Sequence, residues 1–406
     1  MPFPSRTLRL TVLAQNNAGI KDFRPYVPSI NDAGVVAFQA TLEDGHTAVL
    51  THDGSGVTTV ATTVSANSPV QCFSSHPDIN SAGQICIYAH MTRGHDAVVM
   101  LEPDGRLLHT PVDGPLTGIG PLGPTMNESG GVAFRFTSAQ GLASIGVWQD
   151  GHWRSTAQIG TQAVPLTSTP TANTSDAATR PSQPIDGDAG PDASNAGASN
   201  VRFSAFDGLP VVNAAGDVAF RADRSDGLQG VFLARGGQTP VPIITTGGEI
   251  SALARFTILN DLGQIAFAAT TADGEPALFF GDARGGSGTA GITPLLGGHR
   301  SSRDNSGRSG DGGDCDGGGF ESFRGILINK QGPVVFYGTP HGGQLGIYTG
   351  PDPRRDRLLG LGDPLLGGTV SDFALNPVSV NEAGQITVRV ALEDGRQFIL
   401  RGDPER

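Results

Sequence analysis

The chain has 406 residues, with 39 acidic and 27 basic side chains and a formal net charge of −12 at pH 7. This balance argues against a nucleic-acid surface, which needs clustered Lys and Arg to displace counterions, and against binding to anionic membranes. The 59 glycines and 28 prolines, beside 37% hydrophobic residues, indicate many short strands and turns around a core of adequate size.

The chain begins with a short apolar stretch, Leu8 to Leu13, that reads as a β-strand. The longest apolar run near it, Leu10 to Ala14, is interrupted by Thr11, so neither a secretory signal nor a membrane-spanning segment is predicted. We therefore expect a soluble, cytoplasmic monomer. The three cysteines do not form a disulfide framework.

A motif of Asn, two short residues and Gly between apolar runs then recurs seven times. Asn bonds its own backbone in turns and Gly adopts positive φ without steric cost, so each motif predicts a tight turn between two strands. The strand after the turn, such as Val35 to Phe38, is apolar on both faces, which indicates a strand covered on both sides. The motif asparagines are Asn31, Asn80, Asn127, Asn213, Asn260, Asn329 and Asn381.

Third and fourth strands follow in most copies, so each repeat predicts a four-stranded antiparallel sheet. Successive motif asparagines are 49, 47, 86, 47, 69 and 52 residues apart. This period favours an all-β fold, a seven-bladed β-propeller formed by the whole chain as a single domain. The two long gaps contain low-complexity tracts, residues 165–200 and 297–319, which we interpret as loop insertions between blades.

The last repeat ends after its third strand, at Phe398 to Leu400, so it lacks one strand of a complete blade. We expect the N-terminal strand at Leu8 to Leu13 to supply it. Closure of this kind removes the exposed sheet edges that an open array would leave.

The seven motifs resemble those of the bacterial tandem-repeat β-propeller family with the NxxGxxAF signature. The match is literal at Asn31 to Phe38, Asn213 to Phe220 and Asn260 to Phe267, and looser in the second, sixth and seventh copies. The resemblance implies a β-propeller and, in many members, secretion signals and surface anchors, which we do not find in this sequence. It implies no catalytic residue, because the shared positions are turn and core positions.

The first strand of each repeat is expected to line the axis of the ring, and it is where the copies differ most. Its polar residues are the candidates for ligand binding: Arg24, Tyr26, His76, Asp207, Arg255 and Arg324. Arginine guanidinium groups bind carboxylate or phosphate well, so the three arginines indicate a site for a small anion. The alternative is that each arginine pairs with a neighbouring carboxylate such as Asp22, Asp207, Glu321 or Asp372.

Other kinds of site have weaker support. Cys72 and His76 share one strand face, but their Cβ atoms would be roughly 13 Å apart, too far for a nucleophile and its base. Acidic tracts at Asp186–Asp188 and Asp311–Asp316 lack the calcium-loop spacing. With only two tryptophans, a repeated lectin site is disfavoured. No metal, nucleotide or cofactor motif is found, and we expect no cofactor.

Two functions of different classes remain. The first is a propeller that binds a small anionic or carbohydrate-like ligand, or a protein, at the mouth of the channel. The second is an enzyme, a lyase, hydrolase or other small-molecule catalyst, with Tyr26 or His76 as general acid or base. A third possibility is a structural repeat without a pocket. The enzyme requires Tyr26 or His76 within hydrogen-bonding reach of an arginine.

Overall fold

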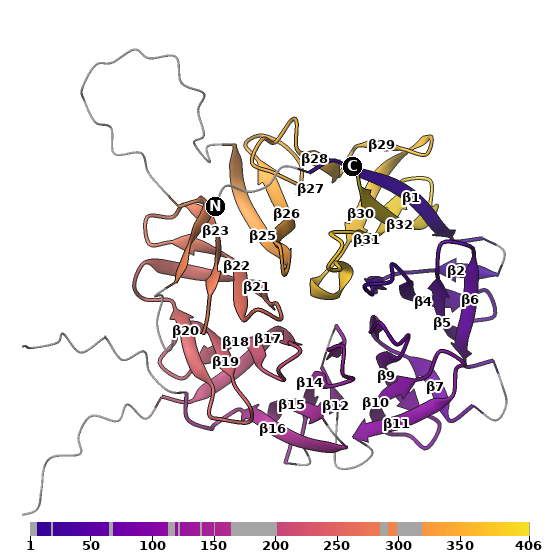
Figure 1. Ribbon diagram of the computed structural model, residues 1–406, viewed down its shortest axis with the longest axis horizontal. Helices are drawn as coiled ribbons and strands as arrows, with labels where there is room; N and C mark the ends of the chain where they lie inside the picture. The colour runs from indigo at the N-terminus through magenta and orange to yellow at the C-terminus, as the bar shows by residue number, and fades with distance from the viewer. Residues whose placement is uncertain are drawn as a thin grey trace, which may run out of the picture.

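The computed structural model describes residues 6–17, 19–64, 68–112, 118–120, 122–138, 140–149, 151–163, 201–284, 291–298 and 319–405. Seven antiparallel sheets stand around a central axis, so the predicted seven-bladed β-propeller is confirmed (Figure 1). The two acidic tracts considered for calcium, the whole of the insertion at residues 165–200 and residues 299–318 of the second insertion lie outside the described residues. No helix in the described part of the chain is long and apolar enough to cross a membrane.

The blades follow the chain in order. Blade one contains β2 (Ile20–Asp22), β3 (Ser29–Ile30), β4 (Val36–Leu42), β5 (Thr47–His52) and β6 (Val57–Thr62). Blade two contains β7 (Val70–Phe73), β8 (Asp78–Ile79), β9 (Ile85–Met91), β10 (Asp96–Leu101) and β11 (Leu107–Val112). Blade three contains β12 (Gly118–Ile119), β13 (Thr125–Met126), β14 (Val132–Thr137), β15 (Ala143–Gln149) and β16 (His152–Gln158). Blade four contains β17 (Phe203–Val212), β18 (Val218–Arg224), β19 (Gln229–Ala234) and β20 (Val241–Thr245). Blade five contains β21 (Ile250–Leu259), β22 (Gln264–Thr271), β23 (Pro276–Asp282) and β24 (Ile292–Gly297). Blade six contains β25 (Phe320–Asn329), β26 (Gly332–Pro340), β27 (Gly346–Tyr348) and β28 (Arg357–Gly360). Blade seven contains β29 (Pro364–Leu365), β30 (Gly368–Ala374), the short 3-10 helix η1 (Pro377–Ser379), β31 (Ile386–Leu392), β32 (Gln397–Pro404) and β1 (Leu8–Gln15).

The first strand is continuous in blades four to six but divided into two pieces in blades one to three. Prolines lie in each of the three breaks, at Pro25 and Pro28, Pro77, and Pro124. Proline has no N–H to donate to a ladder, so it interrupts strand pairing where it falls. The inner wall of the ring is therefore partly loop, and these loops carry side chains toward the axis.

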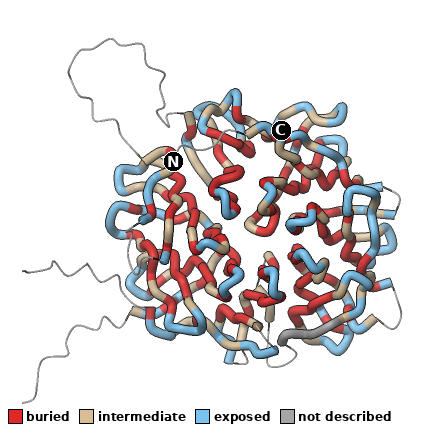
Figure 2. Tube along the Cα trace, viewed as in Figure 1, coloured by how far each residue is buried: buried red, intermediate tan, exposed pale blue. Residues whose placement is uncertain are grey.

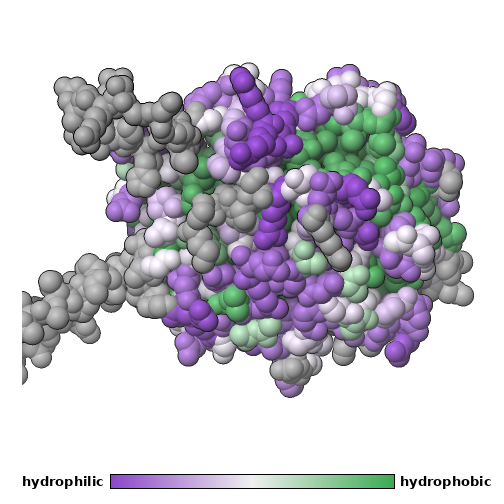
Figure 3. Space-filling view, turned by 45° about the horizontal axis from the view of Figure 1, so that its top comes forward, coloured by the Kyte–Doolittle hydropathy of each residue, from purple (hydrophilic) through white to green (hydrophobic). Residues whose placement is uncertain are grey.

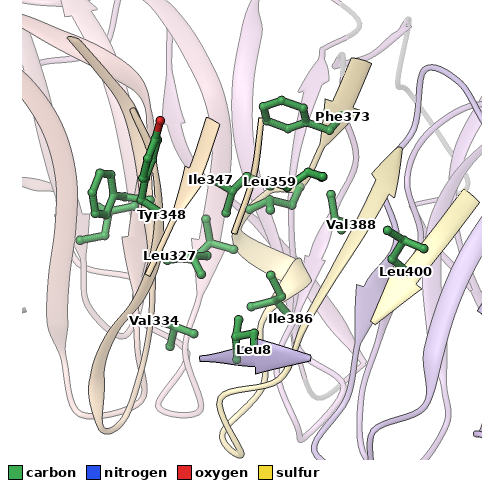
Figure 4. Packing of buried hydrophobic residues seen from close by; sticks show 14 of the residues in the cluster. Leu8, Leu327, Val334, Ile347, Tyr348, Leu359, Phe373, Ile386, Val388 and Leu400 are labelled. Carbon is green, nitrogen blue, oxygen red and sulfur yellow. The ribbon is translucent and has the colours of Figure 1, made fainter. Parts of the chain in front are cut away.

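The N-terminal strand closes the ring as predicted. β1 pairs antiparallel with β32, with Leu8 opposite Pro404 and Gln15 opposite Phe398. Leu8 is 7% exposed and belongs to the same apolar cluster as Val334 of blade six and Ile386 of blade seven (Figure 4). Closure thus combines ladder hydrogen bonds with burial of apolar surface between two blades.

The core lies between neighbouring blades, as the buried segments of Figure 2 show. Val36, Ala37 and Phe38 on β4 are all at most 1% exposed, although successive residues of a strand point to opposite faces. The start of the motif's second strand is apolar on both faces because a blade covers each of them. This confirms the interpretation drawn from the residue pattern.

Each motif asparagine has two roles. In six motifs its side-chain oxygen accepts a backbone N–H four residues on, as in the 2.9 Å bond from Val35 to Asn31 Oδ1, which fixes the turn. Asn329 accepts the Gln331 N–H instead, because Pro333 has no N–H. In six of the seven motifs the Nδ2 of the motif asparagine donates to the backbone oxygen of the asparagine in the next blade. These bonds run Asn31 to Asn80, Asn127 to Asn213, Asn213 to Asn260, Asn260 to Asn329, Asn329 to Asn381 and Asn381 to Asn31, at 2.8–3.5 Å.

Candidate functional site

A pocket of about 330 Å³ lies on the axis of the ring, on the side away from the asparagine turns. We call it the axial pocket. Its wall comes from blades one, two, three, five, six and seven, mainly from residues that precede the motif turns. The lining residues are Pro25, Tyr26, Val27, His76, Leu122, Phe256, Arg324, Tyr337, Leu345, Asp372, Phe373, Ala374, Leu375 and Asn376.

The inner end of the pocket is formed by a contact between blades two and seven. Asn376 Nδ2 lies 3.3 Å from His76 Nδ1, and both residues are buried. Asn376 also accepts the backbone N–H of Val378 at 3.1 Å and so caps η1. η1 also contacts β3 of blade one and β21 of blade five, so blade seven reaches toward the axis at this level.

His76 is held as a neutral imidazole. Burial lowers its pKa to about 4, and hydrogen bonds to the backbone of Pro124 and Leu122 only partly offset that effect. A Cβ atom on Gly123 would lie 2.7 Å from the imidazole Cε1, so this position requires glycine. His76 therefore acts as a fixed, uncharged part of the wall at physiological pH.

Arg324 is the exposed cation of the axial pocket. It precedes Gly325 on β25, where the β25–β26 pairing is irregular. Among the described residues, Arg324 forms no hydrogen bond and no ion pair. The carboxylate Asp372, in the same wall, is occupied by Arg389, whose Nη1 lies 2.9 Å from Asp372 Oδ2.

The other two predicted arginines do not converge with Arg324. Arg24 pairs with Asp22 at 3.4 Å and is exposed, and it does not line the pocket. Arg255 donates from Nε to Asp207 Oδ1 at 3.1 Å, while the buried Arg221 donates to Asp207 Oδ2 at 3.1 Å. Asp207 is thus a counter-ion for two arginines. Arg24 and Arg255 are therefore paired with carboxylates, whereas Arg324 lines the axial pocket.

Tyr26 lines the axial pocket and is partly buried, and burial raises the pKa of its phenol. Neither Tyr26 nor His76 hydrogen-bonds to an arginine among the described residues. Cys72 and His76 form no contact with each other in the described structure. The tyrosine–arginine or histidine–arginine pair that the enzyme requires is therefore not found in this arrangement.

Sequence reasoning missed a layer of side chains eight residues after the motif asparagine, on the second strand. Tyr337 O–H donates to the Leu375 carbonyl at 3.0 Å and accepts the Leu375 N–H at 2.7 Å, which joins blade six to blade seven. Tyr88 makes the same pair of bonds, at 3.1 and 3.0 Å, to Arg135 in blade three. The signal was present, because large polar residues follow the Ala-Phe or equivalent pair in several copies: Tyr88, Arg135, Arg221, Tyr337 and Arg389.

A smaller cavity of about 140 Å³ lies at the asparagine turns, below η1. Asp78 faces it and is 6% exposed, and its Oδ2 accepts the Met126 N–H at 2.6 Å. Burial raises the pKa of Asp78 to about 8, and the nearby Glu128 adds to the rise. The acidic groups at this mouth accept backbone N–H bonds, as Glu128 does from Ser81 at 2.8 Å. The described residues include no cluster of three His, Cys, Asp or Glu that could hold a metal ion.

A third hollow, of about 620 Å³, lies on the outside of blade one. Its walls are mostly apolar, with Leu42, Leu50 and the exposed Val57 among them. Figure 3 shows a mainly hydrophilic surface in its view, with an apolar area on one side of the ring. The hollow has no convergent set of polar groups that would orient a ligand, which distinguishes it from the axial pocket.

No protein-family model matches this chain, and no curated protein matches it. Solved β-propellers resemble it in fold. The WD40 domain of SCAP from fission yeast has a TM-score of 0.39 and 8% identity, and the match covers 97% of this chain and 98% of that one. The propeller domain of the trilobed protease from Pyrococcus furiosus has a TM-score of 0.41 and 10% identity, and the match covers 79% of each chain. A lectin from Burkholderia pseudomallei has a TM-score of 0.42 and 11% identity, and the match covers 94% of this chain and 95% of the lectin.

Proposed function

We propose that this protein binds a small organic anion in the axial pocket, with Arg324 as the group that holds the negative charge. The observation that carries the proposal is the state of Arg324, which lines the pocket and has no ion pair among the described residues. A guanidinium with free donors forms strong charge-assisted hydrogen bonds with a carboxylate or phosphate. The other lining groups do not supply a competing anion, because Asp372 is paired with Arg389.

The rest of the wall suits an apolar or planar ligand body. Tyr26, Phe256 and Phe373 line the pocket, and the Tyr337 ring stacks on Phe373 with centroids 5.8 Å apart. Sites of this kind combine mainly apolar walls with a few polar groups that orient the ligand. A carbohydrate acid, with hydroxyl groups around its body, fits this wall less well than a hydrophobic carboxylate.

The binding function is better supported than the enzymatic one. General acid–base chemistry needs a titrating group at the reacting atoms, and His76 is buried, neutral and already bonded to Asn376. A purely structural propeller would not need an arginine in the pocket wall that has no ion pair among the described residues. A protein partner on the same face is a further possibility, and it would compete with the small ligand for Arg324.

The test is a thermal-shift screen of benzoate, gluconate and inorganic phosphate, followed by titration calorimetry with each compound that stabilises the protein. We expect Arg324→Ala to weaken binding by about 10- to 100-fold, because a hydrogen-bonded charge contributes about 1.5–3 kcal/mol. Arg24→Ala is the matched control, since Arg24 is exposed and lies outside the pocket lining. Equal loss in both variants, or full binding by Arg324→Ala, would reject the site.

A further inference from the structure

Three chemically reactive side chains lie in a row across blade two. Cys72 on β7 is directly opposite His90 on β9, and His90 is directly opposite Asp96 on β10. Directly opposed residues of antiparallel strands have their side chains on the same face, with Cβ atoms about 4.5–5.5 Å apart. The three residues therefore form a continuous Cys–His–Asp row, which their positions 72, 90 and 96 in the sequence do not reveal.

One contact and the exposure of two side chains define the roles within the row. His90 Nδ1 is hydrogen-bonded to Asp96 Oδ1, and with the proton on Nδ1 this bond orients the imidazole and leaves the Nε2 lone pair to accept a proton. His90 is exposed, and the Cys72 thiol is only partly buried, so a reagent in solvent can reach both. A nucleophile beside a base that a third group orients is the arrangement used in nucleophilic catalysis.

We infer that Cys72 is a nucleophilic acyl-acceptor site for activated carboxylic esters, with His90 as its base and Asp96 as the positioning residue. The Cys72 sulfur forms a bond to the acyl carbon, and the bond from that carbon to the ester oxygen breaks. The thiol proton moves to His90 Nε2 and then to the departing oxygen, so the products are an S-acyl cysteine and a free alcohol or phenol. The inference is independent of the axial pocket and its ligand.

The surroundings of Cys72 disfavour its thiolate, so the contribution of His90 to removing the thiol proton should be measurable. Burial raises the pKa of the thiol, the Asp96 charge raises it further, and the backbone N–H of His90 offsets part of the rise. Tyr26 of blade one is the other titratable group that faces Cys72, and His90 faces Asp96. Without a base, the reactive thiolate is scarce at neutral pH, so acylation there depends on proton removal by His90.

The experiment treats the full-length protein with p-nitrophenyl acetate, follows nitrophenolate release across pH, and locates the acetyl group by peptide mass spectrometry. Cys72 is expected to be acetylated, and Cys86, which is fully buried, is the internal control. Cys72→Ser should remove this reaction. His90→Ala should slow it by about 100-fold at neutral pH. It should also change the shape of the pH profile of the rate, because removal of the thiol proton by the imidazole is lost.

The matched control is His152→Ala, which removes an exposed histidine of blade three. It should leave both rate and pH profile unchanged. Asp96→Asn should lower the rate less than His90→Ala does, with the shape of the wild-type pH profile retained, as expected for a positioning residue. If His90→Ala loses thermal stability, His90→Gln provides the same comparison. The inference is overturned if Cys72 stays unmodified in the wild type, or if it reacts with an unchanged rate and pH profile in both His90 variants.

Discussion

At the scale of single residues, the motif asparagine joins local and long-range structure. Its side-chain oxygen fixes the turn within a blade, and its Nδ2 links that blade to the next. Asparagine alone among short side chains offers both a donor and an acceptor of this geometry; aspartate keeps only the acceptor. This explains the Asn of the six copies that make the bond to the next blade, where a turn by itself would also accept Asp or Gly.

Asn381→Asp is therefore expected to destabilise the protein by about 1–3 kcal/mol, since the Asn31 carbonyl would lose its donor and face a carboxylate. Urea unfolding monitored by circular dichroism measures the change. Asn80→Asp is the control, because Asn80 Nδ2 bonds to Gln84 within its own turn and makes no bond to the next blade among the described residues. Similar costs for the two variants would contradict a role in joining blades.

Asp78 gives a residue-level prediction of pH dependence. Its pKa is about 8 in the folded protein, against about 3.9 in an unfolded chain. Between these values the folded state holds a proton that the unfolded state has released, so stability falls as pH rises. His76, with its lowered pKa, acts oppositely but only below about pH 6.5. From pH 6.5 to 8 the free energy of unfolding should fall by roughly 2 kcal/mol.

Asp78→Asn tests this directly, because the amide oxygen can still accept the Met126 N–H and no proton is exchanged. Urea unfolding at a series of pH values should show a flatter profile between pH 6.5 and 8 than that of the wild type. A slope that is the same in both proteins would assign the pH dependence to other groups.

At the scale of elements, neighbouring blades are joined by more than apolar packing. The tyrosine hydroxyls of Tyr88 on β9 and Tyr337 on β26 each bond to both backbone groups of one residue in the next blade. The Tyr337 hydroxyl supplies bonds to the Leu375 backbone just beyond the end of β30, whereas the Arg135 carbonyl also accepts the Gly120 N–H at 3.0 Å. For Tyr337 this contact holds Leu375, which directly precedes the cap of η1, so it also sets one side of the axial pocket.

Tyr337→Phe should cost about 1–3 kcal/mol, because the Leu375 N–H and carbonyl would be left without their partner in a buried position. The variant should also weaken binding of any ligand found in the axial pocket, through displacement of Asn376. Tyr26→Phe serves as the comparison for stability, since Tyr26 has no hydrogen bond among the described residues. Stability of Tyr337→Phe equal to that of Tyr26→Phe would show that the hydroxyl does not hold the blades together.

At the scale of the whole molecule, the ring depends on its first strand. β1 covers the edge of β32, and Leu8 fills a cluster shared by blades six and seven. Without β1, the edge of β32 would be left unpaired, which favours association between chains. Leu8 lies opposite Pro404, and the Glu405 N–H donates to the Thr7 carbonyl at 2.9 Å, so the two strands meet in hairpin geometry.

A chain starting at Gly19 should therefore unfold at a lower temperature and aggregate, as measured by calorimetry and light scattering. A circular permutant that starts at Gly19 and attaches residues 6–17 after residue 405 through a short turn should recover the wild-type unfolding temperature. If the truncated chain is as stable as the wild type, ring closure contributes little. If the permutant does not recover, the strand acts in some other way.

The repeated turn motif and the two-sided apolar strands determined the fold from sequence, because both are local patterns that each blade must satisfy for itself. Closure was also predictable, since the last repeat is one strand short and the surplus strand lies at the other end. The candidate site was only partly predictable. Of the residues named from the sequence, Tyr26, His76 and Arg324 line one pocket, whereas Arg24, Arg255 and Asp207 are engaged in ion pairs elsewhere.

Only the tertiary structure decided which polar groups meet. Strand order in the ring brings His76 against Asn376, 300 residues away, and strand register brings Cys72 opposite His90. The repeat predicts neither of these contacts, because the proline breaks and bulges of the first strands shift each side chain along the axis by a different amount. The sequence by itself therefore determined the ring and the strand that closes it. The chemistry along its axis required the coordinates, since it depends on contacts between blades.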